Sequence, residues 1–194
     1  MVTKMNNEIF EIIKNRRTVR EFNHKPITKD TIEKIIEAAT WAPNHRSTEP
    51  WRFFVLEKNS AKRLEIANLI YDWTYSNVKN PNEERKLSSA ISARKEILDA
   101  PAFIYVYSIP GENSEITKEN YAATCCAIQN LQLASYSIGI GVGWSTGKPC
   151  LCPEVKKALN ITENWEIVGA LYIGYTKTQI SATRTPIEMV TKWL

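Results

Sequence analysis

The sequence is poor in glycine and has no long apolar run. Seven glycines among 194 residues exclude a collagen-like chain, and 43% hydrophobic residues exclude a disordered one. No stretch approaches the roughly 18 consecutive apolar residues of a membrane-spanning helix. The first 14 residues carry Lys4, Glu8, Glu11 and Lys14, where a signal peptide would have an apolar core. We therefore expect one soluble cytoplasmic domain over residues 1–194, with no membrane partner.

The four cysteines are too few for a disulfide framework, and their spacing fits a zinc site badly. Cys125 and Cys126 are adjacent, and Cys150 and Cys152 are one residue apart, whereas structural zinc sites usually present C-x-x-C pairs. Free cysteine is among the most buried residue types. The pattern favours reduced thiols in or near the core and predicts no metal site. No Ser/His/Asp triad stands out either, so the sequence nominates no catalytic side chain.

Charge is unevenly distributed along the chain. Residues 1–63 carry 13 Lys or Arg against 8 Asp or Glu, while residues 64–194 carry 12 against 13. A local excess of five positive charges is too small and too mixed to indicate a nucleic-acid partner. It suits a small anion better.

The hydrophobic pattern predicts helices interleaved with three strands. It indicates helices over residues 6–14, 30–41, from Ser60 to about 70, 83–99, 120–138 and 153–159, and strands over 51–56, 102–107 and 166–175. Thr28 and Ser60 are suited to cap two of the helices. We interpret residues 71–82 as a loop or broken helix, residues 109–118 as a loop, and Gly139, Gly141 and Gly143 as turn residues. The order predicts an α+β layered fold.

Two apolar segments need a surface to cover them. The helix over 120–138 is the least polar one, and apolar residues surround most of it, which predicts burial on nearly all sides. The chain ends in an apolar group of residues, Met189, Val190, Trp193 and Leu194. This end can fold back on its own subunit or reach a partner, and periodicity does not choose between the two.

The most informative polar segment is Arg16-Arg17-Thr18-Val19-Arg20, directly after the first predicted helix. Guanidinium groups bind phosphate oxygens through paired donors, and a hydroxyl adds another donor. The segment is therefore either an anion site or a solvated basic turn with surface ion pairs.

Together with later motifs, this segment resembles the opening of the nitroreductase family of FMN-dependent NAD(P)H oxidoreductases. The similar residues are Arg16 to Phe22, Pro26, the helix over 32–39, Trp41-Ala42-Pro43 and Pro50-Trp51-Arg52-Phe53. The resemblance continues to residue 175 and is strongest to the small, minimal branch of the family. It implies a mixed, mostly antiparallel sheet flanked by helices, a buried central helix, an extended C-terminal arm and a homodimer with FMN at the subunit interface.

The resemblance also implies roles for individual residues. Arg16 and Thr18, supported by Arg17 and Arg20, would hold the phosphate and ribityl chain of FMN. His45 and Glu49 match loop positions that reach the flavin from the neighbouring subunit. The remaining matches are Trp144, Ser145 and Thr146, in a segment that lines the flavin, and Arg184, a late basic residue that reaches the phosphate.

Glu49 departs from the family pattern, which usually has Gln before Pro-Trp. Gln both donates and accepts hydrogen bonds, whereas an ionised Glu only accepts. A carboxylate beside a reduced, anionic flavin is unfavourable unless it is protonated or paired, and Arg46 and Arg52 are candidate partners. Glu49 therefore either turns away from the site or tunes it.

The activity implied by the resemblance is hydride transfer from NADH or NADPH, through FMN, to a nitroaromatic, a quinone or a similar electron-poor acceptor. Two alternatives stay open. The same fold and flavin could serve a different redox reaction on a specific metabolite, such as oxidative dehydrogenation or dehalogenation. The chain could also be a non-catalytic FMN-binding sensor or a flavin-free anion-binding module. Tyr71, Trp73 and Tyr75 either cover the substrate side of the flavin or pack ordinarily.

Overall fold

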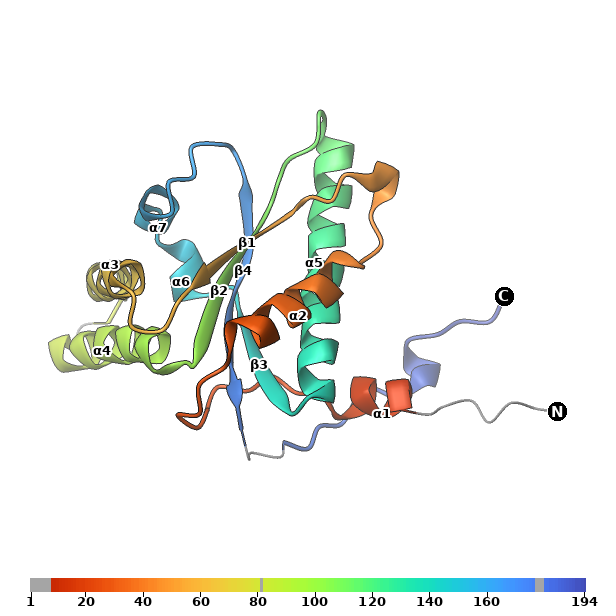
Figure 1. Ribbon diagram of the computed structural model, residues 1–194, viewed down its shortest axis with the longest axis horizontal. Helices are drawn as coiled ribbons and strands as arrows, with labels where there is room; N and C mark the ends of the chain where they lie inside the picture. The colour runs from red at the N-terminus through yellow and green to blue at the C-terminus, as the bar shows by residue number, and fades with distance from the viewer. Residues whose placement is uncertain (1–7, 81, 177–179) are drawn as a thin grey trace.

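The computed structural model describes residues 8–80, 82–176 and 180–194, which form a four-stranded sheet between two layers of helices (Figure 1). The strands are β1 (Trp51–Leu56), β2 (Ala102–Ser108), β3 (Ile140–Ser145) and β4 (Glu166–Tyr175). Their order is β1-β2-β4-β3, and every neighbouring pair is antiparallel. An isolated parallel bridge joins Thr18 to Val142 of β3, which is an edge strand. The predicted α+β layered fold is confirmed.

Helices cover both faces of the sheet (Figure 1). One face carries α2 (Lys29–Thr40) and α5 (Ser114–Ser137), and the other carries α3 (Ala61–Asn77), α4 (Glu83–Asp99), α6 (Lys148–Leu151) and α7 (Glu154–Ala158). The remaining helices are α1 (Glu8–Asn15), beside the C-terminal end of α5, and two short 3₁₀ helices, η1 (His45–Ser47) and η2 (Ile187–Met189). No described helix has the length and hydropathy needed to span a bilayer.

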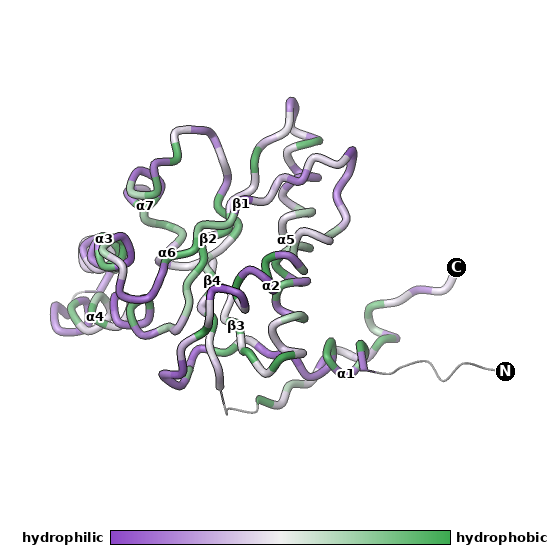
Figure 2. The backbone as a smooth tube through the Cα atoms, viewed as in Figure 1, coloured by the Kyte–Doolittle hydropathy of each residue, from purple (hydrophilic) through white to green (hydrophobic). Residues whose placement is uncertain are grey.

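The core is divided by the sheet into two clusters. All residues of β2 are buried, and because successive side chains of a strand point to opposite faces, this strand contributes to both. Ile104 and Val106 pack toward α5 and α2, whereas Phe103, Tyr105 and Tyr107 pack toward α3 and α4. Figure 2 shows the hydrophobic residues gathered along the strands, with hydrophilic residues on the outer parts of α3 and α4.

Local sequence signals predicted several elements closely. β1, β4 and α4 have the bounds expected from their apolar patterns. The Thr28 side chain accepts from the Thr31 amide at 3.3 Å, and the Ser60 side chain accepts from the Arg63 amide at 3.1 Å, so both predicted caps are confirmed. Residues 6 and 7 of the first predicted helix lie outside the described residues, and the rest of that helix is present as α1.

Two predicted loops are wrong over part of their length. α3 continues to Asn77, since no glycine or proline interrupts it before Pro81. α5 begins at Ser114, well before residue 120, because the Asn113 side chain caps it by accepting from the Ile116 amide at 2.9 Å. The polar composition of these two segments therefore led to wrong predictions for the end of α3 and the start of α5.

The interpretation of three glycines as turn residues holds for only one of them. Gly139 has a φ of 77° and forms the turn before β3. Gly141 and Gly143 instead lie inside β3. A Cβ atom at Gly141 would lie 2.8 Å from Cγ2 of Val19, and one at Gly143 would collide with the Val19 carbonyl. The two glycines therefore allow the segment after α1 to lie directly against the edge strand.

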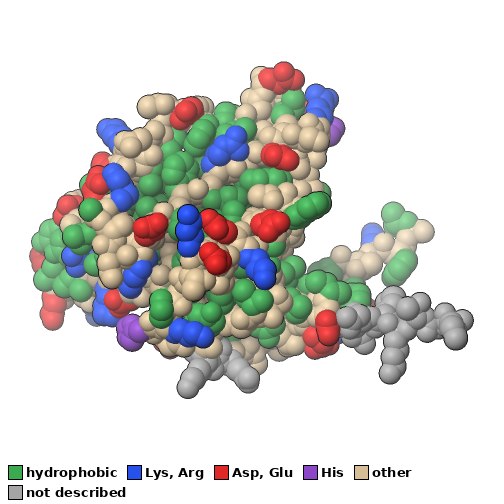
Figure 3. Space-filling view, viewed as in Figure 1, with side chains coloured by type: hydrophobic (Ala, Val, Ile, Leu, Met, Phe, Trp, Pro, Cys, Tyr) green, Lys and Arg blue, Asp and Glu red, His purple; other side chains and the backbone are tan. Residues whose placement is uncertain are grey.

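Apolar side chains remain exposed at one end of the molecule. Ile9, Phe10 and Ile13 of α1 are about half exposed, and Trp193 is 93% exposed in a C-terminal segment that extends away from the body (Figures 1 and 3). α5 is not buried on all sides as predicted. The sheet and α2 cover two of its sides, and an exposed stripe remains that includes Ala122, Cys126 and Tyr136.

Candidate functional site

The arginine segment lies where the chain leaves α1 and meets the outer edge of β3. Val19 is buried, and its amide donates to the carbonyl of Val142 at 3.2 Å. Thr18 and Arg20, on either side of Val19, are exposed. This main-chain attachment, together with the bridge at Thr18, fixes the basic segment on the edge of the sheet.

Arg16 and Arg17 are partly buried and carry hydrogen-bond donors without partners. Arg16 Nη1 donates to Oε1 of Gln132, a buried residue of α5, at 3.2 Å, and Arg17 Nη1 donates to the carbonyl of Arg16 at 2.6 Å. The Nε atoms of both arginines are buried and have no hydrogen-bond partner among the described residues. Because an unpaired buried donor costs about 1–3 kcal/mol, two adjacent ones indicate a site for an anion.

The charges of this region are crowded. The pKa of Arg16 is lowered from its usual value, first by burial and then by the positive charges of Arg17 and Arg184. Arg184 comes from the C-terminal segment and is exposed, and its Nη1 donates to the carbonyl of Thr183 at 2.9 Å. The ion pairs found among the described residues include none of these arginines. A phosphate group would satisfy the free donors and relieve the repulsion.

Arg20 points elsewhere. It lines a surface cavity together with Ser92, Lys95 and Glu96 of α4. A role for Arg20 toward the cofactor stays a prediction.

The segment Trp144–Thr146 continues along the same edge of the sheet. Because the Val142 carbonyl points outward to Val19, the alternation of an antiparallel strand directs the main-chain groups of Trp144 to the same open edge, about 7 Å farther on. Trp144 Nε1 donates to the Val168 carbonyl at 3.1 Å, and the Ser145 side chain accepts from the Gly147 amide at 3.3 Å. An elongated ligand could therefore contact the arginines at one end and this strand edge at the other.

The loop over residues 44–49 lies at the opposite end of α5. His45 Nδ1 is 2.7 Å from Oε2 of Glu119, whereas Arg16 contacts Gln132 of the same helix. Thirteen residues of α-helix separate the two contact points by about 20 Å. The structure therefore brings Arg16, Arg17 and Thr18 to the edge of β3 but does not bring His45 or Glu49 to them within one chain.

Glu49 is exposed, and Arg52, one of the two predicted partners of its carboxylate, contacts main-chain carbonyls instead. Arg52 Nη1 donates to the main-chain carbonyl of Glu49 at 3.0 Å. The ion pairs found in the described part of the chain include neither Arg46 nor Arg52. The Glu49 carboxylate is thus left facing solvent.

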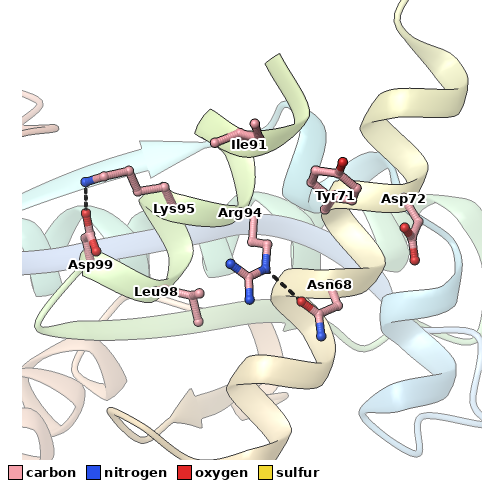
Figure 4. A pocket seen from close by; sticks show the side chains of 8 residues that line it. All are labelled: Asn68, Tyr71, Asp72, Ile91, Arg94, Lys95, Leu98 and Asp99. Carbon is pink, nitrogen blue, oxygen red and sulfur yellow. Dashed lines mark hydrogen bonds and ion pairs between the residues drawn. The ribbon is translucent and has the colours of Figure 1, made fainter. Parts of the chain in front are cut away.

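A separate groove of about 720 Å³ lies between α3 and α4, across the sheet from α5 (Figure 4). Tyr71 lines it, and Arg94 Nε donates there to the Asn68 side chain at 2.7 Å. Trp73 packs against the core, and the Tyr75 hydroxyl donates to Glu83 at 3.1 Å. The three aromatic residues therefore lie on the sheet face away from the Arg16–Gln132 contact of their own chain.

All four cysteines are free. Burial raises the pKa of Cys150 to about 12, and burial with a hydrogen bond to Glu154 raises that of Cys152 to about 11, so both are protonated and unreactive thiols at neutral pH. Cys126 is exposed, which corrects the expectation that every thiol lies in or near the core.

Two polar residues that support the site were not predicted from the sequence. Gln132 and Asn120 are 4% and 3% exposed, and both lie on α5, the helix with the most apolar pattern. Their signal was present in the sequence, since a large polar side chain within an apolar helix needs a buried partner.

Comparisons with known proteins place the sequence and the fold in one family. The sequence profile of the nitroreductase family matches residues 13–175. YfhC of Bacillus subtilis, named as a candidate NAD(P)H nitroreductase, is 34% identical over 92% of this chain and 90% of its own. A nitroreductase-like family protein from Bacillus cereus has a TM-score of 0.83 at 30% identity, covering 100% of this chain and 98% of its own. A nitroreductase with bound FMN from Bacteroides fragilis has a TM-score of 0.75 at 26% identity, covering 97% of this chain and 100% of its own.

Proposed function

The chain belongs to the nitroreductase family, and we propose that it is an FMN-dependent oxidoreductase of the cytoplasm. It would take hydride from NADH or NADPH and pass electrons to a nitroaromatic, a quinone or a similar electron-poor acceptor. The observation that carries the proposal is the pair of buried, unpartnered Nε donors of Arg16 and Arg17. They lie where the family resemblance assigns the phosphate of FMN.

The residues present fit this cofactor. Arg16, Arg17 and Thr18 would hold the phosphate, with Arg184 as a further positive charge. The open edge of β3 at Trp144–Thr146 would offer main-chain groups to the ring. Bound FMN supplies the two-electron chemistry itself. The protein contributes binding, orientation and electrostatics, which explains why its sequence contains no nucleophilic triad.

The same proposal includes a homodimer. His45 and Glu49 lie about 20 Å along α5 from the Gln132 contact of Arg16, so they would reach the cofactor of the other subunit. The exposed stripe of α5, the apolar residues of α1 and the apolar C-terminal segment offer surfaces for such a partner. Light scattering at micromolar concentration is expected to give twice the mass of the chain, and a monomer would remove the shared site.

The direct test of the activity is the colour of the purified protein. We expect it to absorb as oxidised flavin and to bleach when NADH or NADPH is added without oxygen. A chain that stays colourless after incubation with FMN would be the anion-binding module, and a yellow one that does not bleach would be the sensor. With an acceptor present, alternating occupancy predicts parallel double-reciprocal plots, and intersecting plots would exclude that order.

A further inference from the structure

The loop over residues 44–49 has an unusual backbone. Arg46, Ser47 and Glu49 have φ values of 56°, 52° and 42°. Among the residues that the structure describes, the other non-glycine residues with positive φ are Asn59 and Asn160, and asparagine tolerates this region best. Each such residue that is not glycine or asparagine costs about 1 kcal/mol or more. The surrounding structure must therefore hold this loop in place.

Polar side chains of α5 hold it. Thr48 Oγ1 donates to Oδ1 of the buried Asn120 at 2.9 Å, and Asn120 Nδ2 donates to the Ile109 carbonyl at 3.1 Å. Within the loop, Oδ1 of Asn44 accepts from the Glu49 amide at 3.0 Å. The loop is thus anchored to α5 at Asn120, one residue after Glu119.

The contact of His45 with Glu119 fixes which ring nitrogen is available. An ionised carboxylate only accepts hydrogen bonds, so Nδ1 of His45 donates its proton to Glu119 across 2.7 Å. Nε2 makes no hydrogen bond with the described residues and remains for another group. The hydrogen bond made by one imidazole nitrogen sets the state of the other.

We propose that Glu119 is a positioning residue, which orients His45 so that Nε2 is presented to the ligand bound at the arginine segment of the partner subunit. This inference rests on the proposed function, because that function assigns the ligand and the partner. Glu119 itself does not touch the ligand. Asn120 acts on the backbone of the same loop, so two consecutive residues of α5 fix both the ring and the chain that carries it.

The tautomer of His45 can be measured without the cofactor. The chain has only two histidines, so the substitution His24→Gln leaves one imidazole for ¹⁵N NMR. We expect the neutral ring of His45 to carry its proton on Nδ1 in the full-length, flavin-free protein. Glu119→Ala should abolish that preference. Glu115→Ala removes the same charge from an exposed position one turn earlier and should leave it intact.

Binding of FMN provides the second readout. We expect Glu119→Ala to weaken FMN binding about three- to tenfold, the effect of one hydrogen bond, with an unchanged melting temperature because the His45–Glu119 pair is exposed. Glu119→Gln keeps an acceptor oxygen and should recover part of the loss, while Glu115→Ala should bind as the unmodified chain does.

The outcomes separate the two claims. A proton on Nε2 in the unmodified chain, or a tautomer that Glu119→Ala leaves unchanged, would overturn the positioning role. FMN binding equal in Glu119→Ala and the unmodified chain would overturn it as well. Failure of the unmodified chain to bind FMN at all would instead overturn the proposed function, whatever the NMR result.

Discussion

Two regions of this protein each contain an arginine that is at least partly buried, and they use it differently. Arg63 of α3 is 1% exposed, and its Nε and Nη2 donate to the Ile97 carbonyl at 2.9 and 2.6 Å. It also donates to the carbonyls of Leu56 and Ala100. Arg16, at the edge of β3, is less buried, yet its Nε has no partner among the described residues.

The two arginines therefore differ in their hydrogen-bond partners as well as in their depth of burial. The donors of Arg63 reach carbonyls at the C-terminal end of α4, where unsatisfied acceptors and the helix dipole favour a cation. Burial lowers the pKa of Arg63 to about 10, so it stays charged at neutral pH. Arg16 is surrounded by other arginines and keeps a donor for a group outside the chain.

The largest effect should come from Arg63→Met. The substitution removes the buried hydrogen bonds from Arg63 to the main-chain carbonyls of Leu56, Ile97 and Ala100. Because a hydrogen bond from a charged group contributes about 1.5–3 kcal/mol, the free energy of unfolding should fall by about 3 kcal/mol or more. Urea unfolding measures this. Arg85→Met, at an exposed position of α4, should change it by less than about 0.5 kcal/mol. If Arg63→Met lowers the free energy of unfolding by less than about 1 kcal/mol, the contrast between Arg63 and Arg16 does not hold.

Arg16→Gln should behave in the opposite way. In flavin-free protein at low salt, the free energy of unfolding should stay unchanged or rise by about 0.5 kcal/mol, because one crowded positive charge is removed. Arg16→Lys keeps the charge and should show no gain. If Arg16→Gln instead lowers the free energy of unfolding by more than about 2 kcal/mol, Arg16 is a structural residue like Arg63.

Arg46→Gly tests a third kind of energetic cost, which lies in the backbone. Glycine adopts positive φ freely, so the free energy of unfolding should rise by about 0.5 kcal/mol while the freed loop binds FMN less tightly. Asn59→Gly is the matched control. It should raise the free energy of unfolding by less, since asparagine already tolerates a positive φ. Thermal unfolding measures the stability, and FMN titration measures the affinity. If neither the stability nor the affinity changes, the loop is not strained.

The smallest effect is expected at Glu49. Replacing this exposed carboxylate by Gln should tighten FMN binding by a few-fold, because a negative charge is removed near an anionic ligand. Fluorescence titration against Glu57→Gln, an exposed control, measures it. Unchanged or weaker affinity would mean that the Glu49 carboxylate stays away from the cofactor.

The sequence predicted what is determined locally. The apolar runs Trp51–Leu56 and Glu166–Tyr175 and the caps at Thr28 and Ser60 depend on neighbours in the chain, and they are present as expected. Gly141 and Gly143 were misinterpreted because their reason is the close approach of Val19, more than a hundred residues away.

The candidate site was predictable in the same partial way. The basic cluster is visible in the sequence, but its attachment to β3 and its contact with Gln132 arise only from folding. The cluster marks Arg16 as a candidate, but nothing local in the sequence indicates that Arg63 is buried and structural. Only their surroundings, three carbonyls for one and other arginines for the other, reveal their different uses.

The most direct test of the central claim, that Arg16 and its neighbours hold the phosphate of FMN, is to compare the affinities for FMN and for riboflavin, which lacks the phosphate. The unmodified chain should prefer FMN by about a hundredfold, the value expected for two charge-assisted hydrogen bonds, and Arg16→Gln should lose most of that preference while binding riboflavin unchanged. Equal affinity of the unmodified chain for both ligands, or an Arg16→Gln variant that weakens both equally, would contradict the account.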